Sequence, residues 1–303
     1  LAAGGTPSCA VELWTGSGQP VGAWSTGGSL NTARTALSGA GTSNTSALAF
    51  GGEGAPTTGA TESYNGSAWT EVNDLNSAKQ LAAGTGTQTS ALSIGGLVSS
   101  SKSALTESWN GTSWTEVNDL NTARRDLGSA GADITAALAF SGNLSPGSTN
   151  ITESWNGTSW TEVNDLNTAR MLPGSTGTQP SALCFGGFVP DFTSVYALTE
   201  SWNGTSWTEV GDLNSARAGA AGAGISTAAL AFGGGDTPNK AVTEEWNGSS
   251  WAETSDLNTA RSGLAGSGTT TSALAYGGNV PPPSAATEEW NNPSNVIKVI
   301  TTS

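Results

Sequence analysis

The sequence predicts an all-β protein built from one repeated unit, and three observations lead to this prediction. The phrase TESWNGTSWTEVNDLNTAR occurs at 106–124 and again at 152–170, with close variants elsewhere. No segment shows a sustained helical periodicity. A single tryptophan position recurs at spacings of 45, 45, 46, 47 and 44 residues, at Trp24, Trp69, Trp114, Trp160, Trp207 and Trp251. A period this regular indicates one supersecondary unit that stacks on its neighbours.

Each unit is predicted to contain four short strands, here termed a to d. Strand a follows a basic residue and is rich in small residues, as in Gly128 to Gly131. Strand b is an apolar run such as Ser46 to Phe50, strand c is Thr-Glu-Ser-Trp, and strand d is Trp-Thr-Glu-Val. Between c and d, an Asn-Gly step predicts a hairpin with a type I′ turn. Four strands per unit predict the blades of a β-propeller, with small strand-a residues at the crowded axis.

The sequence indicates the type of blade more directly than it indicates the number of blades. Strands b and c each occur seven times, starting with Leu1–Gly5 and Ala10–Trp14, whereas strand a occurs six times. We therefore expect a seven-bladed β-propeller of four-stranded antiparallel blades, one domain over 1–303, whose first blade lacks its innermost strand. Val296–Ile300 is then the seventh strand d. Two alternatives stay open: Val296–Ser303 supplies the missing strand a, or six closed blades carry an extra hairpin.

The order of glycine doublets and aromatic residues resembles that of the Kelch family, in which an apolar strand ends in Gly-Gly and an aromatic strand and a Trp follow. The doublets lie at Gly4–Gly5, Gly51–Gly52, Gly95–Gly96, Gly186–Gly187, Gly233–Gly234 and Gly277–Gly278, with Ser141–Gly142 as a variant. The first aromatic follows at Trp14, Tyr64, Trp109, Trp155, Trp202, Trp246 and Trp290. The resemblance covers essentially the whole chain. The wording of the repeats is also similar to Kelch-type proteins of marine phages and environmental bacteria, which implies an exterior location.

Most aromatic and acidic residues are interpreted as structural because they recur in the blades. All 12 Trp lie at the c or d positions, where the wedge between blades needs bulk. In the corner between d and a, Asp is expected to cap backbone groups and to pair with the basic residue. The residues assigned to these structural roles are Trp109, Trp114, Asp119, Arg124, Trp155, Trp160, Asp165 and Arg170.

Composition argues against several classes of function. The net charge of −14 opposes binding to nucleic acid or to anionic membranes. The chain has no His, so it lacks the usual imidazole base and the commonest Zn ligand. No apolar run is long enough to span a bilayer. We therefore expect no catalytic residue, no metal site, no cofactor and no membrane insertion.

Function is expected where the blades differ, and the b–c loops differ most. These loops are predicted to emerge on the same face as the d–a corners, and loops on a rigid scaffold commonly carry recognition. The longest runs from Phe188 to Leu198, and its candidate binding residues are Phe188, Asp191, Phe192 and Tyr196.

The predicted function is a non-enzymatic recognition or structural module on an exterior surface, such as a virion or a secreted or cell-surface assembly. It would contact a protein partner or a surface receptor, as in phage attachment to a host. A glycan-binding lectin is the first alternative, with a glycan as partner, and a carbohydrate-active enzyme is the second, because paired carboxylates alone can suffice for glycoside hydrolysis.

Overall fold

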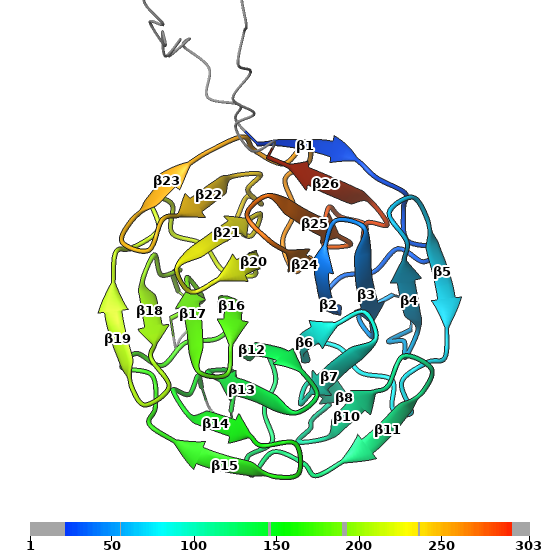
Figure 1. Cartoon of the computed structure of the whole chain (residues 1–303), viewed down its shortest axis with the longest axis vertical. Coiled ribbons are helices and arrows are strands. Elements are labelled where there is room, and N and C mark those ends of the chain that lie inside the picture. The colour runs from blue at the N-terminus through cyan, green and yellow to red at the C-terminus, as the bar shows by residue number, and fades with distance from the viewer. Residues whose placement is uncertain (1–21, 55, 145–146, 190–192, 236, 293–303) are drawn as a thin grey trace, which may run out of the picture.

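A computed structural model describes residues 22–54, 56–144, 147–189, 193–235 and 237–292, and these form a ring of blades around a central axis (Figure 1). The ring contains six four-stranded antiparallel sheets and one two-stranded hairpin. The predicted all-β propeller of four-stranded antiparallel blades is confirmed, whereas the predicted number of seven blades is wrong. No helix of the described residues is long and apolar enough to cross a membrane.

The strands follow the chain from the axis to the rim within each blade. Blade 1 is β2 (Ser38–Ser43), β3 (Ser46–Phe50), β4 (Thr61–Tyr64) and β5 (Trp69–Val72). Blade 2 is β6 (Ala83–Thr87), β7 (Ser90–Ile94), β10 (Thr106–Trp109) and β11 (Trp114–Val117). Its b–c loop holds the small hairpin β8 (Leu97–Val98) and β9 (Ser101–Lys102). Blade 3 is β12 (Gly128–Asp133), β13 (Ala136–Phe140), β14 (Thr152–Trp155) and β15 (Trp160–Val163).

The remaining three blades repeat this pattern, with one exception in the last. Blade 4 is β16 (Gly174–Thr178), β17 (Ser181–Phe185), β18 (Thr199–Trp202) and β19 (Trp207–Val210). Blade 5 is β20 (Ala221–Ile225), β21 (Ala228–Phe232), β22 (Thr243–Trp246) and β23 (Trp251–Glu253). Blade 6 is β24 (Ala265–Gly268), β25 (Ser272–Tyr276), β26 (Thr287–Asn291) and, from the other end of the chain, β1 (Ala23–Thr26).

The position of β1 explains why the blade count differs from the prediction. β1 pairs with β26, with Trp24 opposite Trp290, so the first described strand is strand d of the last blade rather than of a first one (Figure 1). Each blade needs an innermost strand, and the sequence supplies six strands a. Counting strands b and c overestimated the number by one. The additional copies at Leu1–Gly5 and Ala10–Trp14, and Val296–Ser303, lie outside the described residues.

Hydrogen bonds between blades close the ring without a gap. In each blade, the indole Nε1 of the strand d Trp donates to the hydroxyl of the first strand c Thr in the preceding blade. Trp114 donates to Thr61 at 3.1 Å, and Trp69 closes the circle by donating to Thr287 of blade 6 at 3.0 Å. The wedge beneath is apolar, as where Phe50 of blade 1 lies against Trp114 with ring centroids 4.8 Å apart. Each blade therefore contacts a neighbouring blade on both sides, and six blades complete the ring.

The c–d hairpins form where predicted, but their turn type differs from the prediction. Tyr64 pairs with Trp69, so the loop comprises four residues, and among them Gly66 alone has a positive φ, of 92°. Asn65 instead accepts hydrogen bonds through Oδ1 from the amides of Ser67 and Ala68, at 3.0 Å each. The Asn thus acts as a local cap and the Gly supplies the left-handed backbone conformation, rather than both forming a type I′ turn.

Candidate functional site

The basic residue that precedes each strand a forms a buried ion pair within the scaffold. The Nη1 atom of Arg124 lies 2.5 Å from Oε1 of Glu153 in β14, and both side chains are almost fully buried. The second carboxylate oxygen of Glu153 accepts hydrogen bonds from the backbone amide and the side-chain amide of Asn121, at 2.7 and 2.8 Å. Equivalent pairs recur in the other five blades, at Arg34–Glu62, Lys79–Glu107, Arg170–Glu200, Arg217–Glu244 and Arg261–Glu288.

Of the two roles expected for the corner Asp, capping of backbone groups is confirmed, whereas the ion pair with the basic residue is formed by a Glu instead. Asp119 Oδ1 accepts a hydrogen bond from the backbone amide of Thr106 at 3.1 Å, and Asp165 accepts the equivalent bond from Thr152 at 3.0 Å. The Asp therefore caps the start of strand c, while the Glu of strand c pairs with the basic residue.

The side chains of the described tryptophans are also buried within the fold. Trp109, Trp114, Trp155 and Trp160 are 5% exposed or less. The indole of Trp109 donates to the carbonyl of Gln88, and that of Trp155 donates to the carbonyl of Ile134. These rings have neither exposed faces on which a sugar could stack nor spare donors to bind one.

The two faces of the ring differ in how closely their sequences repeat from blade to blade. We call the face that carries the d–a corners and the b–c loops the loop face, and the face that carries the a–b and c–d turns the hairpin face. On the hairpin face, the same Asn-Gly turn recurs in five blades, at 65–66, 110–111, 156–157, 203–204 and 247–248. On the loop face, each b–c loop is anchored by a β-bridge to the corner beside it, as between Met171 and Phe188, but its sequence changes from blade to blade.

A ring of six backbone hydrogen bonds surrounds the axis on the loop face. One residue from each d–a corner adopts a left-handed conformation and donates its amide to the carbonyl of the equivalent residue in the preceding blade. The distances are 2.8 to 3.0 Å, and the sixth bond, from Ala36 to Gly263, closes the ring. The six residues are Ala36, Leu81, Asp126, Leu172, Gly219 and Gly263, with φ between 52° and 61°. We call this the axial ring.

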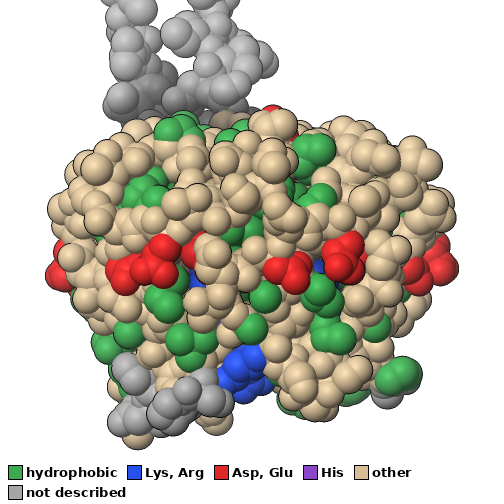
Figure 2. Space-filling model, turned by 90° about the horizontal axis from the view of Figure 1, so that it is seen from below, with side chains coloured by type: hydrophobic (Ala, Val, Ile, Leu, Met, Phe, Trp, Pro, Cys, Tyr) green, Lys and Arg blue, Asp and Glu red, His purple; other side chains and the backbone are tan. Residues whose placement is uncertain are grey.

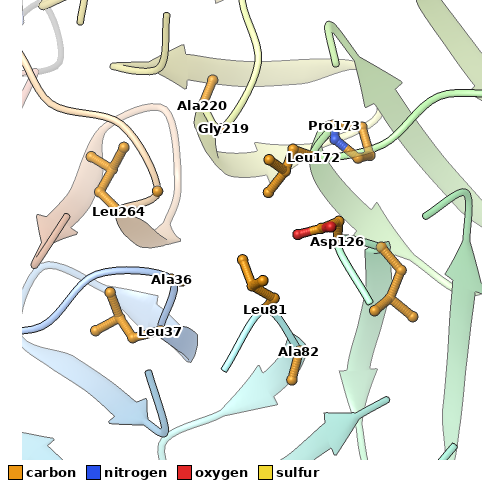
Figure 3. A pocket seen from close by; sticks show the side chains of 12 residues that line it. Ala36, Leu37, Leu81, Ala82, Asp126, Leu172, Pro173, Gly219, Ala220 and Leu264 are labelled. Carbon is orange, nitrogen blue, oxygen red and sulfur yellow. The ribbon is translucent and has the colours of Figure 1, made fainter. Parts of the chain in front are cut away.

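The axial ring opens into a cavity of about 110 Å³ at the centre of the loop face. Besides the ring residues, Leu37, Ala82, Leu127, Pro173, Ala220 and Leu264 line it. Figure 3 shows the side chains of Leu81 and Leu172 on either side of Asp126, whose carboxylate is directed toward the opening. We call this cavity the axial pocket.

Asp126 is the one charged residue among those that line the axial pocket. It is 5% exposed, and its Oδ2 atom lies 3.3 Å from Nε of Arg125. Burial raises the pKa of Asp126 to about 6, although the positive charges of Arg125 and of Lys102 in β9 act in the opposite direction. A buried carboxylate with a raised pKa in a cavity is a feature typical of functional sites.

The binding residues proposed from the sequence lie beside this pocket only in part. Phe188 is half-buried and exchanges backbone hydrogen bonds with Met171, whose neighbour Leu172 belongs to the axial ring. Tyr196 is half-buried too, and its amide donates to the carbonyl of Gly187. Asp191 and Phe192 lie outside the described residues. The structure therefore places Phe188 and Tyr196 on the loop face.

Sequence reasoning missed Asp126 and Arg125. Both residues follow the repeated Arg124 directly, at positions where blade 2 has Gln80 and Leu81. The signal was a pair of opposite charges at positions that are uncharged in the other described corners. A repeat assigns roles by recurrence, and this pair of charges occurs in one corner only.

The outer surface of the ring is acidic. Figure 2 shows Asp and Glu side chains in a band along the side of the rim that faces the viewer, with little basic surface there. The exposed residues at the repeated positions of strand d and its corner are Glu71, Asp74, Glu116, Asp119, Glu162, Asp165, Glu209, Asp212, Glu253 and Asp256. No group of three or more Cys, Asp and Glu side chains within the described residues is arranged to hold a metal ion.

A scan against models of known protein families finds none that matches this chain, and a search of curated proteins finds no similar sequence.

Proposed function

We propose that this chain is a non-enzymatic, Kelch-type binding module that recognises a protein partner through its loop face. One observation carries the proposal: the repeated Trp, strand c Glu and basic side chains are buried and hold the scaffold together, whereas the variation between blades is concentrated on the loop face. The β-propeller fold is compatible with a protein-interaction module. Variable loops and corners on a rigid ring are the common location of recognition surfaces.

The hairpin face is the weaker candidate for a specific contact. Its outer turns repeat one Asn-Gly design in five blades, and the Asn side chains are engaged in capping their own turns. A partner on this face would meet nearly the same surface in each of those blades. The loop face, in contrast, has a different residue directly after the repeated basic residue in each of the six corners, and it carries a central pocket.

We place the module on an exterior surface, such as a virion or a secreted or cell-surface assembly. The support is the resemblance of the repeat wording to phage and environmental bacterial proteins, together with a net charge of −14 that disfavours nucleic acid and anionic membranes as partners. We propose no catalytic activity, because the chain has no His and its repeated strand c Glu and corner Asp side chains are committed to ion pairs and to capping.

Site-specific photo-crosslinking tests the proposal in the material from which the chain originates. A photoreactive amino acid is placed at exposed Glu53 or Ser194 on the loop face, and at exposed Thr112 or Thr158 on the hairpin face as matched controls. We expect one partner protein to be captured reproducibly from the loop face and not from the hairpin face. Capture of the same partner from the hairpin face alone would contradict the proposal.

A further inference from the structure

The axial pocket combines an apolar wall with a single acidic group. Of the 12 residues that line it, Asp126 alone carries a charge, and its carboxylate points toward the opening, with Leu81 and Leu172 on either side (Figure 3). Oδ2 lies near Arg125, but Arg125 is not among the residues that line the pocket. Arg125 thus approaches the carboxylate from outside the cavity and leaves the inner side open to a ligand.

Folding does not require an acidic residue at this position. Blades 2 and 4 have Leu81 and Leu172 at the equivalent place in the axial ring, with the same left-handed backbone and the same hydrogen bonds. A carboxylate that is 5% exposed has lost most of its hydration. A residue that lowers stability where the fold accepts an apolar one is commonly retained for function.

The chemistry of the pocket favours a cation on a short aliphatic chain. The leucine side chains offer apolar contact, and a buried carboxylate forms its strongest hydrogen bonds with a charged N–H donor. The acidic band around the rim and the net charge of −14 give the molecule a negative field that attracts cations. The volume of about 110 Å³ suits a chain of a few methylene groups rather than a drug-sized molecule.

We propose that the axial pocket binds a primary ammonium group on a short aliphatic chain, with Asp126 as the residue that selects it. A lysine side chain of the protein partner has this chemistry, and so does a free small amine. The lysine source rests on the proposed function of the loop face, whereas the ammonium specificity of the pocket stands on its own.

A titration with n-butylammonium tests the pocket directly, because this probe reproduces the aliphatic chain and charge of lysine. Binding is followed through the amide resonances of Leu81, Asp126 and Leu172 at pH 7.5. We expect saturable shifts at these amides, and an affinity at least about tenfold higher than for butyrate or butan-1-ol, since only the cation forms a charge-assisted bond to the carboxylate. Absence of saturable binding to the folded protein would overturn the proposal.

The blades themselves provide matched variants that the axial ring already accommodates. Asp126→Leu copies Leu81 of blade 2, and we expect it to weaken butylammonium binding at least about tenfold. Arg125→Gln copies Gln80, and we expect it to tighten binding a few-fold by removing a competing cation. The double variant copies both residues of blade 2 and should bind like Asp126→Leu. Equal binding by the original protein and Asp126→Leu would contradict the role of Asp126.

Lowering the pH provides an independent check on the same carboxylate. With a pKa of about 6, roughly one in ten Asp126 side chains is ionised at pH 5, so binding should weaken about tenfold between pH 7.5 and pH 5. The charged groups that act on this carboxylate are Arg125 and Lys102. Binding that is unchanged at pH 5 would contradict the proposal.

Peptides distinguish the two sources of the ammonium group, a lysine side chain of the partner and a free small amine. The peptide acetyl-Gly-Lys-Gly-amide should bind in competition with butylammonium, whereas its norleucine counterpart should not. Binding of butylammonium without binding of the lysine peptide would support a free amine as the ligand. If the loop face captures no partner in the crosslinking experiment while butylammonium still binds, the proposed function fails and the ammonium specificity stands.

Discussion

At the scale of single residues, stability depends on buried ion pairs that each join the corner entering a blade to strand c of that blade. Glu153 bonds the guanidinium of Arg124 with one oxygen and the amide groups of Asn121 with the other. A buried pair of this kind contributes little beyond an apolar replacement, but removal of one partner leaves an uncompensated charge in a dry environment.

Glu153→Gln should therefore destabilise the protein strongly. We expect a loss of about 3 kcal/mol, because Arg124 keeps its charge without a carboxylate partner. The urea midpoint at pH 7 measures this loss. The matched control Glu162→Gln, on exposed Glu162 of β15, should change stability by less than about 0.5 kcal/mol. Equal midpoints for the two variants would show that the buried pair is dispensable.

Lys79→Arg should stabilise blade 2. Lys79 occupies the position where the other blades have Arg, and its Nζ atom lies 3.5 Å from Glu107 and 3.3 to 3.4 Å from the carbonyls of Leu105 and Ser93. A guanidinium has more donors and the planar geometry that these acceptors match in the other blades. We expect a gain of about 1 kcal/mol in thermal or urea denaturation, and an opposite change for Arg34→Lys. A lower midpoint for Lys79→Arg would refute this explanation.

Asp126→Leu should stabilise the protein in a pH-dependent way. The pKa of Asp126 is raised to about 6 from the ordinary 3.8, so the folded state binds this proton more tightly than the unfolded state. The stability of the original protein therefore falls as the pH rises from about 4 to about 6. The free energy of unfolding of Asp126→Leu should therefore exceed that of the original protein by a margin that grows by up to about 3 kcal/mol as the pH rises through this window. Thermal unfolding at pH 4 and at pH 7.5 measures the difference. An advantage that is constant with pH would contradict the burial of this charge.

Some of these residue roles could be predicted from the repeat and others could not. Recurrence of Arg124 and its equivalents indicated a structural role, but not the partner, because Glu153 lies 29 residues further along the chain. Only the register of β14 against its neighbours brings the two together. Asp126 was missed for the opposite reason, since it occurs in one blade and its burial depends on the axial ring formed by all six.

At the scale of elements, the blades are joined by the strand d Trp of one blade and the strand c Thr of the preceding blade. Trp114 fills the wedge against Phe50 and donates its indole N–H to Thr61. The same contact links every neighbouring pair of blades, so the ring is held by six equivalent joints.

A double-mutant cycle should detect one such joint. Trp114→Phe and Thr61→Val should each destabilise the protein, and their coupling energy should be about 1 kcal/mol, as expected for a buried hydrogen bond. Urea denaturation of the two single variants and the double variant gives this energy. Trp114→Phe combined with Thr152→Val is the control, because Thr152 accepts from Trp207 instead, and this pair should be additive. Coupling in the control pair alone would contradict the assignment.

Strand positions could be predicted from sequence more reliably than blade number. Strand b at Ser46–Phe50, strand c at Thr106–Trp109 and strand d at Trp114–Val117 coincide with β3, β10 and β11. Their local signals, an apolar run and an Asn-Gly turn, act over a few residues. Closure of the ring depends on which distant strand β1 joins, and no local pattern distinguishes β26 from the strand c copy at Ala10–Trp14.

At the scale of the whole molecule, the ring separates structure from recognition. Its rim carries the acidic band (Figure 2), its hairpin face repeats one turn design, and its loop face carries the differing loops and the axial pocket (Figure 3). The two described ends of the chain meet in blade 6, where β1 pairs with β26. The assignment of both faces and of the pocket therefore depends on a ring that closes at six blades.

An engineered disulfide between β1 and β26 tests this closure most directly. Ala23 and Asn291 are exposed and directly opposite each other in the two strands. Directly opposed residues in antiparallel strands are close enough for a disulfide to form. The background carries Cys9→Ser, and the remaining Cys184 is fully buried. After oxidation of Ala23→Cys/Asn291→Cys, six-blade closure predicts an intramolecular crosslink in a monomer and a higher thermal midpoint, measured by intact mass and non-reducing electrophoresis. Free thiols or purely intermolecular crosslinks in the folded protein would contradict it.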